Sequence, residues 1–328
     1  MEGLVLGSTA PTSDPARSLV RIATVDAIRS AHRSGHPLWV ELGERTDELV
    51  ALLQETFGLH PLVVEDIFSD RSAPKIEPLG EYLYIVVHAL RPTTDPTRMG
   101  FVVLDVIVGK SFVLTQHRDG QATDRMRTRL EATPELLSKG SAWVTHAFLD
   151  AIIDRYLPQM AALVARVDES ELRVLDRSAE DETLLPELVM LRRAVQSIHR
   201  ISRHQEALLR ELAQTDFALI PTEARPYFRD VHEHFSRVAD DADRCVDVMT
   251  STIEAHLSVQ SNRMNATVKR LTLMSTVMLP LNLIASFYGM NFIHTPEFAW
   301  PYGRTAVVGL MLAVTAAVWM YFRRKRWV

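Results

Sequence analysis

Two stretches near the end of the chain contain no charged residue. They cover residues 271–288 and 305–322, and each is about 18 residues long, which a helix needs to cross a hydrocarbon core of about 30 Å. The chain before residue 271 mixes apolar and polar positions as water-soluble proteins do. The pattern therefore predicts a soluble part followed by a C-terminal transmembrane hairpin of two helices.

The soluble part begins with mixed secondary structure. Runs rich in Val, Ile, Tyr and Phe predict strands at residues 38–42, 82–90, 101–108 and 112–116, with a tight turn at 109–111. Helical periodicity occurs at residues 46–57 and 60–69, where Pro61 suits a first helical turn. These signals predict an α+β domain over residues 19–140. Residues 1–18 lack the pattern of a signal peptide and predict a disordered tail.

Beyond residue 140 the strand signals stop and long helices follow. Breaks near residues 181–186 and 221–226 predict two antiparallel helices of about 35 and 30 residues within 141–225. Residues 227–279 contain neither Gly nor Pro, so they predict one helix about 80 Å long. We divide this region into a stalk (226–270), a first span (271–290), an outer loop (291–303), a second span (304–323) and a basic tail (324–328).

The predicted stalk carries a seam of apolar residues at alternating spacings of three and four, which is typical of a coiled coil. A core helix in a monomeric bundle would explain this spacing equally well. The seam consists of Phe228, Val231, Phe235, Val238, Ala242, Cys245 and Met249.

A second stripe with the same spacing lies within the first span and the residues just before it, and five of its seven residues are small polar residues or amides. Polar side chains in hydrocarbon are costly unless they are paired or wet. The stripe therefore faces another helix, as Ser and Thr often do, or water in a pore shared by several copies of the chain. Val268 and Leu279 would then form hydrophobic constrictions. The stripe consists of Asn265, Val268, Thr272, Ser275, Leu279, Asn282 and Ser286.

Charge and composition indicate the protein's partners, its compartment and its orientation in the membrane. The net charge of -5 argues against a nucleic-acid partner, and the single cysteine, Cys245, suits a reducing compartment. The basic run at 323–326 follows the second span, while the linker 289–303 has no Lys or Arg. The positive-inside rule then places both termini in the cytoplasm of a protein that crosses the cell (inner or plasma) membrane twice.

The sequence gives no support for an enzyme or an organic cofactor. The run Gly109, Lys110, Ser111 lacks the earlier glycine of a phosphate-binding loop and lies between predicted strands. His232 and His234 lack the spacing of a zinc protease helix.

A short motif after the first span carries a family resemblance. Tyr288 is followed by Gly289, Met290, Asn291 and Phe292, and a Thr-Pro-Glu-Phe run ends at Phe298. Together with the two spans and the basic end, this resembles the Gly-Met-Asn signature of the CorA family of magnesium and cobalt transporters. Segments 60–66, 226–230 and 280–281 also resemble the family.

The resemblance implies a funnel-shaped homopentamer in the lipid bilayer that passes hydrated divalent cations. Gly289, Met290 and Asn291 would form the selectivity filter, because neutral carboxamides can hydrogen-bond to the water shell that Mg²⁺ releases reluctantly. Glu297 in the outer loop would attract cations, or would be an ordinary loop acid. Intracellular Mg²⁺ would bind between neighbouring subunits and close the pore, with candidate residues Asp66, Asp230, Glu65, His234 and Asp168.

Three functions remain open from the sequence. The first is Mg²⁺ uptake down the electrochemical gradient, with Co²⁺ and Ni²⁺ as further ions, gated by intracellular Mg²⁺. The second is Zn²⁺ transport by a relative in the same superfamily, against which the absence of Cys and His from the stripe argues. The third is a membrane-anchored signalling or scaffold protein that conducts no ion.

Overall fold

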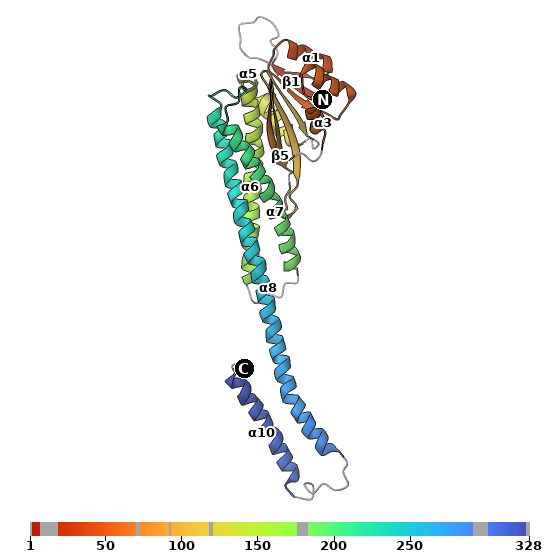
Figure 1. The fold of residues 1–328 in the computed structure, drawn as a ribbon, viewed down its shortest axis with the longest axis vertical. Coiled ribbons are helices and arrows are strands. Elements are labelled where there is room, and N and C mark those ends of the chain that lie inside the picture. The colour runs from red at the N-terminus through yellow and green to blue at the C-terminus, as the bar shows by residue number, and fades with distance from the viewer. Residues whose placement is uncertain are drawn as a thin grey trace. The chain divides into compact units, whose positions relative to one another are not determined.

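The computed structural model describes residues 2–6, 19–69, 73–91, 93–117, 121–175, 183–290 and 301–325. The chain divides into two compact units, Met1–Thr252 and Ile253–Val328 (Figure 1). The boundary falls within the predicted stalk, so the first half of that stalk belongs to the soluble unit and the second half to the unit with the apolar helices.

The first unit is built on a seven-stranded sheet with the order β2-β1-β3-β7-β6-β5-β4. The strands are β1 (Glu2–Leu6), β2 (Leu19–Ile22), β3 (Leu38–Leu42), β4 (Lys75–Leu79), β5 (Tyr82–Leu90), β6 (Phe101–Gly109) and β7 (Phe112–His117). Strands β3 and β7 pair in parallel and the other pairs are antiparallel. The four predicted strands are confirmed as β3, β5, β6 and β7.

The prediction of a disordered tail over residues 1–18 is wrong for β1. Its backbone pairs with β2 on one side and with β3 on the other, where Leu4 lies opposite Trp39. These pairings satisfy the backbone hydrogen-bonding groups on both edges of β1. The partner strands are distant in the sequence, so a short apolar stretch followed by Gly, Ser and Pro gave no local sign of the strand. Residues 7–18 lie outside the described residues.

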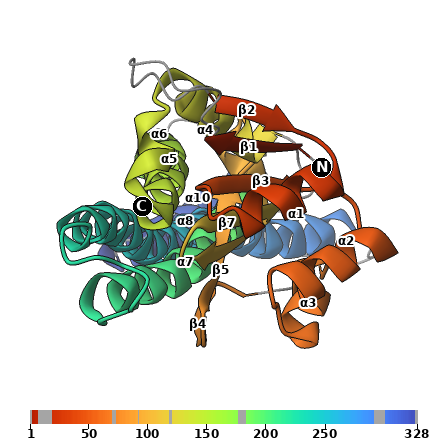
Figure 2. The same ribbon diagram turned by 90° about the horizontal axis from the view of Figure 1, so that it is seen from above.

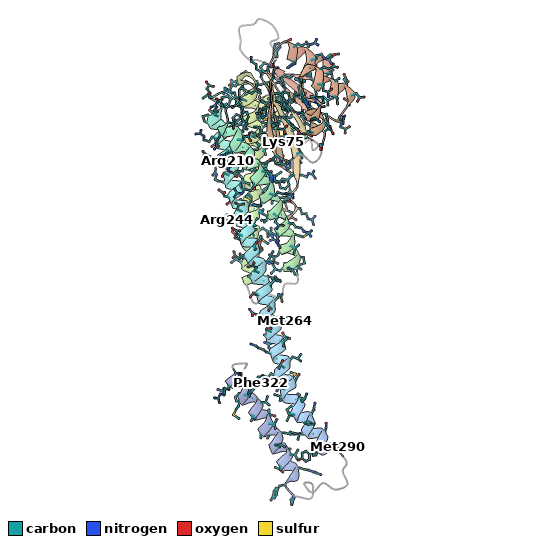
Figure 3. The ribbon with its side chains drawn as sticks, viewed as in Figure 1. Lys75, Arg210, Arg244, Met264, Met290 and Phe322 are labelled. Atoms are coloured by element: carbon teal, nitrogen blue, oxygen red, sulfur yellow. The ribbon has the colours of Figure 1, made fainter. Side chains whose placement is uncertain are left out.

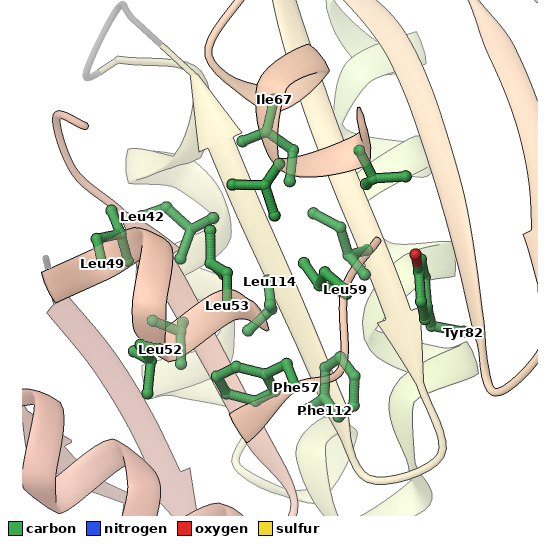
Figure 4. Close-up of a cluster of buried hydrophobic side chains, with 14 of the residues drawn as sticks. Leu42, Leu49, Leu52, Leu53, Phe57, Leu59, Ile67, Tyr82, Phe112 and Leu114 are labelled. Atoms are coloured by element: carbon green, nitrogen blue, oxygen red, sulfur yellow. The ribbon is translucent and has the colours of Figure 1, made fainter. Parts of the chain in front are cut away.

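One face of the sheet is covered by short helices: α1 (Val25–Arg33), α2 (Asp47–Ala51), the π-helix η1 (Leu52–Thr56) and α3 (Pro61–Ile67). Thr24 and Thr46 cap α1 and α2 by accepting backbone N–H bonds, and Pro61 occupies the first turn of α3 as predicted. Tyr82, Phe112 and Leu114 of the sheet meet Leu52 and Phe57 in one buried cluster (Figure 4).

The other face is covered by long helices, α6 (Ser141–Leu175, 35 residues) and α7 (Leu184–Gln214, 31 residues), as predicted. Three shorter helices complete the unit: η2 (Pro96–Arg98) in the connection between β5 and β6, and α4 (Gln121–Ala132) and α5 (Glu135–Lys139) between β7 and α6 in the chain. Phe148 of α6 stacks on Trp39 with ring centres 5.7 Å apart, and the Tyr156 hydroxyl donates to the carbonyl of His88 at 2.8 Å. Figure 2 shows α3 and the pair α6–α7 on different sides of the strands.

The predicted long helix is α8 (Arg225–Gly289), an unbroken run of 65 residues that includes Pro280. All seven residues of its apolar seam are buried, each with at most 2% exposure. Phe235 packs edge-to-face against Tyr156 of α6, with ring centres 5.0 Å apart. The seam is therefore filled from within the same chain, which favours the bundle-core interpretation over a coiled coil between copies.

The second unit contains the last part of α8 and α10 (Gly303–Arg324). Both helices are long and apolar enough to cross a membrane, with mean hydropathy of 1.5 and 1.9 over their most apolar stretches. Those stretches are 0% and 6% buried, whereas the core helix of a soluble protein would be covered. The two predicted spans lie within these helices.

Candidate functional site: the polar face of α8 and the acidic residues

All seven residues of the polar stripe are exposed on one side of α8. Val268 and Leu279, the two apolar members, are 53% and 71% exposed. The other members are also exposed: Asn265, Thr272, Ser275, Asn282 and Ser286. Because their spacing alternates between three and four, they share one side of the helix.

The opposite side of α8 is partly covered. Its half-buried positions recur with the same period, at Leu273, Val277, Leu281, Ile284 and Tyr288. Half-buried positions of α10 recur likewise, at Val307, Met311, Val314 and Val318. These two sides are where the helices of the second unit pack, so the polar stripe points away from α10.

Hydroxyl groups on this part of α8 bond to their own helix. Thr272 donates to the carbonyl of Val268 at 2.8 Å, and Thr276 donates to the carbonyl of Thr272 at 2.7 Å. Such bonds satisfy the hydroxyl hydrogen in apolar surroundings without a partner helix.

The predicted selectivity filter begins where α8 ends. Gly289 is the last helical residue, and the Met290 N–H donates to the carbonyl of Phe287 at 3.4 Å. Met290 is 55% exposed at the tip of α8 (Figure 3). Asn291 and Glu297 lie outside the described residues.

Asp66 lies on α3 in a cluster of charges that the sequence did not predict. Its Oδ2 atom is 2.8 Å from the Nζ atom of Lys75, which also lies 3.1 Å from Glu77. Burial lowers the pKa of Lys75, but the bonds to Asp66 and Glu77 outweigh burial and raise it. Lys75 is thus a firmly charged partner that a metal ion at Asp66 would have to displace.

A buried carboxyl group lies beneath this cluster. Asp105 of β6 is 2% exposed and accepts a hydrogen bond of 2.7 Å from the Tyr84 hydroxyl. Burial raises the pKa of Asp105 to about 7, although the Tyr84 bond acts in the opposite direction. The ring of Tyr84 in turn lies 4.9 Å from Lys75 Nζ.

Asp230 and His234 lie one turn apart in α8, with 3.6 Å between His234 Nε2 and Asp230 Oδ1. Glu65 is exposed on α3 and Asp168 is exposed on α6. Since α3 and the long helices cover different faces of the sheet (Figure 2), Asp66 and Asp230 do not meet within one chain. Among the described residues, no three His, Cys, Asp or Glu side chains are grouped closely enough to hold a metal ion.

Comparison with known proteins places the chain in a family. The family model described as CorA-like Mg²⁺ transporter protein matches residues 34–324. The chain belongs to this CorA-like family. It is 31% identical to YfjQ of Bacillus subtilis over 88% of this chain and 89% of that protein. It is 30% identical to the cobalt/magnesium transport protein CorA of Thermotoga maritima over 93% of this chain and 87% of that protein.

A solved CorA structure shares the fold. The CorA magnesium transporter of Methanocaldococcus jannaschii is 21% identical and superposes with a TM-score of 0.77, covering 100% of this chain and 99% of that one. The match includes the soluble α/β unit, the long helix and the apolar C-terminal helix. CorA-like proteins are ion transporters of membranes rather than enzymes, in agreement with the two exposed apolar helices found here.

Proposed function

We propose that this chain forms a homopentameric channel through which Mg²⁺ enters the cytoplasm, with Co²⁺ and Ni²⁺ as further permeant ions. One observation carries the proposal: a row of hydroxyl and amide side chains is exposed on an otherwise apolar helix, on the side opposite α10. Five copies of this side around one axis would enclose a polar path, and α10 would lie outside it. The relatives named for cobalt and magnesium transport support the choice of ion.

The chemistry of the row suits a hydrated ion. Mg²⁺ holds its water shell tightly and prefers oxygen ligands, and the row offers neutral oxygens from Thr272, Ser275 and Asn282. In the proposed filter, five Asn291 carboxamides would bond to the water shell without removing it, and Glu297 would raise the local cation concentration. Carboxylates in the filter would bind too tightly for rapid release.

The membrane potential supplies the driving force. A doubly charged ion gains about 4.6 kcal/mol for every 100 mV of an inside-negative potential. Inward flow therefore needs no nucleotide. Both termini would face the cytoplasm, because the basic residues follow the second span.

Reconstituted protein tests this function directly. We expect liposomes containing the full-length protein to take up Mg²⁺ when a potential is imposed, reported by a dye inside the vesicles. Asn291→Ala should reduce the uptake more than tenfold, while Arg304→Gln, outside the stripe, serves as the matched control. Measuring uptake with Mg²⁺ and Zn²⁺ in competition distinguishes a Mg²⁺ channel from a Zn²⁺ transporter. Absence of flux for either ion would support the scaffold function instead.

For regulation, we propose that Mg²⁺ binds between Asp66 of one subunit and Asp230 of its neighbour, with Glu65, His234 and Asp168 nearby. The two residues lie on different sides of the same unit, so a shared ion would have to join two copies. Bound Mg²⁺ would neutralise the clustered carboxylates, and its loss would let the subunits separate. Lys75 would compete with Mg²⁺ for Asp66, because the ion would have to displace the Lys75 ammonium group, which lies 2.8 Å from the Asp66 carboxylate.

Two variants test the regulation and act in opposite directions. Asp66→Ala with Asp230→Ala should keep the channel open at high internal Mg²⁺. Lys75→Met should remove the competing charge and shift closure to lower internal Mg²⁺. Normal closure in the double variant would exclude this site. A closing Mg²⁺ concentration that is unchanged by Lys75→Met would exclude the competition while leaving the channel function intact.

A further inference from the structure

A groove of about 680 Å³ lies along α8 at the start of the first span. Sites for small ligands usually enclose about 300–1,000 Å³, so the groove is large enough to hold part of an extended molecule. Among the described residues, those that line it come from α8: Ala266, Lys269, Arg270, Leu273, Met274, Val277 and Met278.

The groove has a charged end and an apolar end. Lys269 and Arg270 lie at one end, and the next two turns contribute only Leu, Met and Val side chains. The distance from Arg270 to Met278 is about 12 Å along the helix. The charged groups thus lie just before the uncharged run 271–288, and the apolar wall continues into it.

Further features mark the charged end as a membrane–water interface. The last turn of α10 carries Arg323 and Arg324, and the Arg323 guanidinium lies 5.1 Å from the ring of Trp319. Tryptophan and basic residues collect at such interfaces. Phe322 and Met290 mark opposite ends of the hairpin (Figure 3). Near Met290, the described residues 280–290 and 301–310 carry a single basic side chain, Arg304.

We infer that this groove binds an anionic phospholipid, with the phosphate headgroup at Lys269 and Arg270 and one acyl chain along Leu273, Met274 and Val277. The charges are complementary, and the apolar wall runs in the direction in which an acyl chain enters a bilayer. Met274 and Met278 have flexible side chains that adapt to an irregular apolar partner. A free phosphate ion would use only the charged end and leave this wall uncovered.

The groove and the proposed pore use different sides of the same helix. The groove includes the half-buried residues Leu273 and Val277, while the polar stripe lies on the opposite side of α8. A lipid in the groove would therefore lie outside the polar path. The inference extends beyond ion transport, because lipid binding needs neither an ion gradient nor an open pore.

Mass spectrometry of the intact, full-length protein complex tests the inference. The protein is freed of lipid in neutral detergent and offered equal amounts of dioleoyl phosphatidylglycerol and dioleoyl phosphatidylcholine. We expect the phosphatidylglycerol to be retained preferentially. Lys269→Gln with Arg270→Gln should lower the ratio of the two bound lipids about 25-fold, since each basic group near a membrane surface contributes about fivefold.

A charge-matched control separates the groove from general attraction. Arg323→Gln with Arg324→Gln removes the same charge at the same end of the hairpin, outside the groove lining, and should change the ratio much less. Equal losses in both double variants would overturn the inference. Displacement of the bound lipid by excess glycerol 1-phosphate would also overturn it, because the site would then be a phosphate site.

A steric test needs no change of charge. Met274→Trp should fill the groove and reduce the number of bound phosphatidylglycerol molecules. Leu283→Trp, at a residue that is 69% exposed outside the groove, should leave the number unchanged. If both variants bind lipid as the unmodified protein does, the groove is not the site. If the unmodified protein retains neither lipid, the inference fails.

Discussion

The two units of this protein differ in how they treat apolar side chains. In the soluble unit, Trp39, Tyr156 and Phe235 are at most 1% exposed and are packed by residues of the same chain. In the described residues after position 252, Phe322 is the only buried hydrophobic side chain, and Leu279 and Leu283 are 71% and 69% exposed. The first unit contains its own core, whereas the second leaves its apolar surface exposed, as helices that cross a membrane do.

The comparison shows that one helix can be packed inside a protein core over its first part and be exposed and apolar over its last part. The first part of α8 supplies the buried seam of a bundle, and its last part supplies exposed Leu and Met side chains. A burial pattern that changes along a single helix therefore indicates where the surroundings change from protein to lipid. Substitutions on the two sides of that change should have very different effects on stability.

The largest expected effect is in the core of the soluble unit. Trp39→Ala removes a ring that stacks on Phe148 and an indole N–H that donates to Thr115 Oγ1 at 3.0 Å. We expect a loss of about 3–5 kcal/mol of unfolding free energy, because the cavity cannot be filled by its neighbours. Circular dichroism of the full-length protein during denaturation measures this loss. A loss below 1 kcal/mol would contradict a tightly packed core.

Asp105→Asn should stabilise the protein at neutral and alkaline pH. The unfolded carboxyl group ionises above pH 4, whereas in the folded protein its pKa is about 7, so rising pH penalises the folded state between these values. Asn keeps an acceptor for Tyr84 and avoids this penalty. The gain should approach roughly 4 kcal/mol above pH 7 and disappear below pH 4. Thermal unfolding of both proteins at pH 4 and pH 8 measures the gain in stability at each pH. A gain that is equal at the two pH values would contradict a raised pKa of Asp105.

Glu206→Gln should show the opposite sign. Glu206 is 5% exposed on α7 and pairs with Arg210 and Arg203. Burial raises its pKa, but the arginines outweigh burial and lower it, so its stabilisation is present above the unfolded pKa and is lost as pH falls through the folded pKa. We expect Gln to cost about 1–2 kcal/mol at pH 7 and progressively less as the pH falls below the unfolded pKa. The same unfolding experiment measures this cost, and a cost that does not decrease as the pH falls would contradict the charge pairing.

The smallest effect belongs to the second unit. Leu283→Ala should change the unfolding free energy of the soluble unit by less than about 0.5 kcal/mol, since the side chain is exposed and lies outside that unit. Circular dichroism of the two proteins in the same detergent provides the comparison. A change above 1 kcal/mol would show that the two units unfold together.

Sequence patterns predicted those parts of the fold whose signal is local. Strands β5 to β7 are dense in β-branched and aromatic residues, and α6, α7 and α8 have long helical periods. Strand β4 was missed because Pro78 weakens its signal, although proline is tolerated on an edge strand such as this one. The seam of α8 was found, but its spacing could not distinguish a partner within the chain from one in another copy.

In the candidate site, too, the features with a local sequence signal were predicted and the contacts between distant residues were not. The stripe from Asn265 to Ser286 was visible because its spacing lies within one helix. Lys75 was missed as the partner of Asp66, because their contact depends on how β4 lies beside α3. The pair of Tyr84 and Asp105 depends on the register of β5 and β6, in which Val86 lies opposite Asp105. The proposed ion between Asp66 and Asp230 would require a second copy of the chain, and the sequence of one chain cannot show how two copies meet.

The hydroxyl bond of Thr272 has a consequence for which ions the proposed pore would admit. A threonine hydroxyl has one hydrogen and two lone pairs, and here the hydrogen is engaged by the carbonyl of Val268. Only lone pairs then face outward at this level of the helix. Water molecules around a cation point their hydrogens outward and can bond to such a surface, whereas the water shell of chloride points oxygens outward and would find no hydrogen to accept from Thr272.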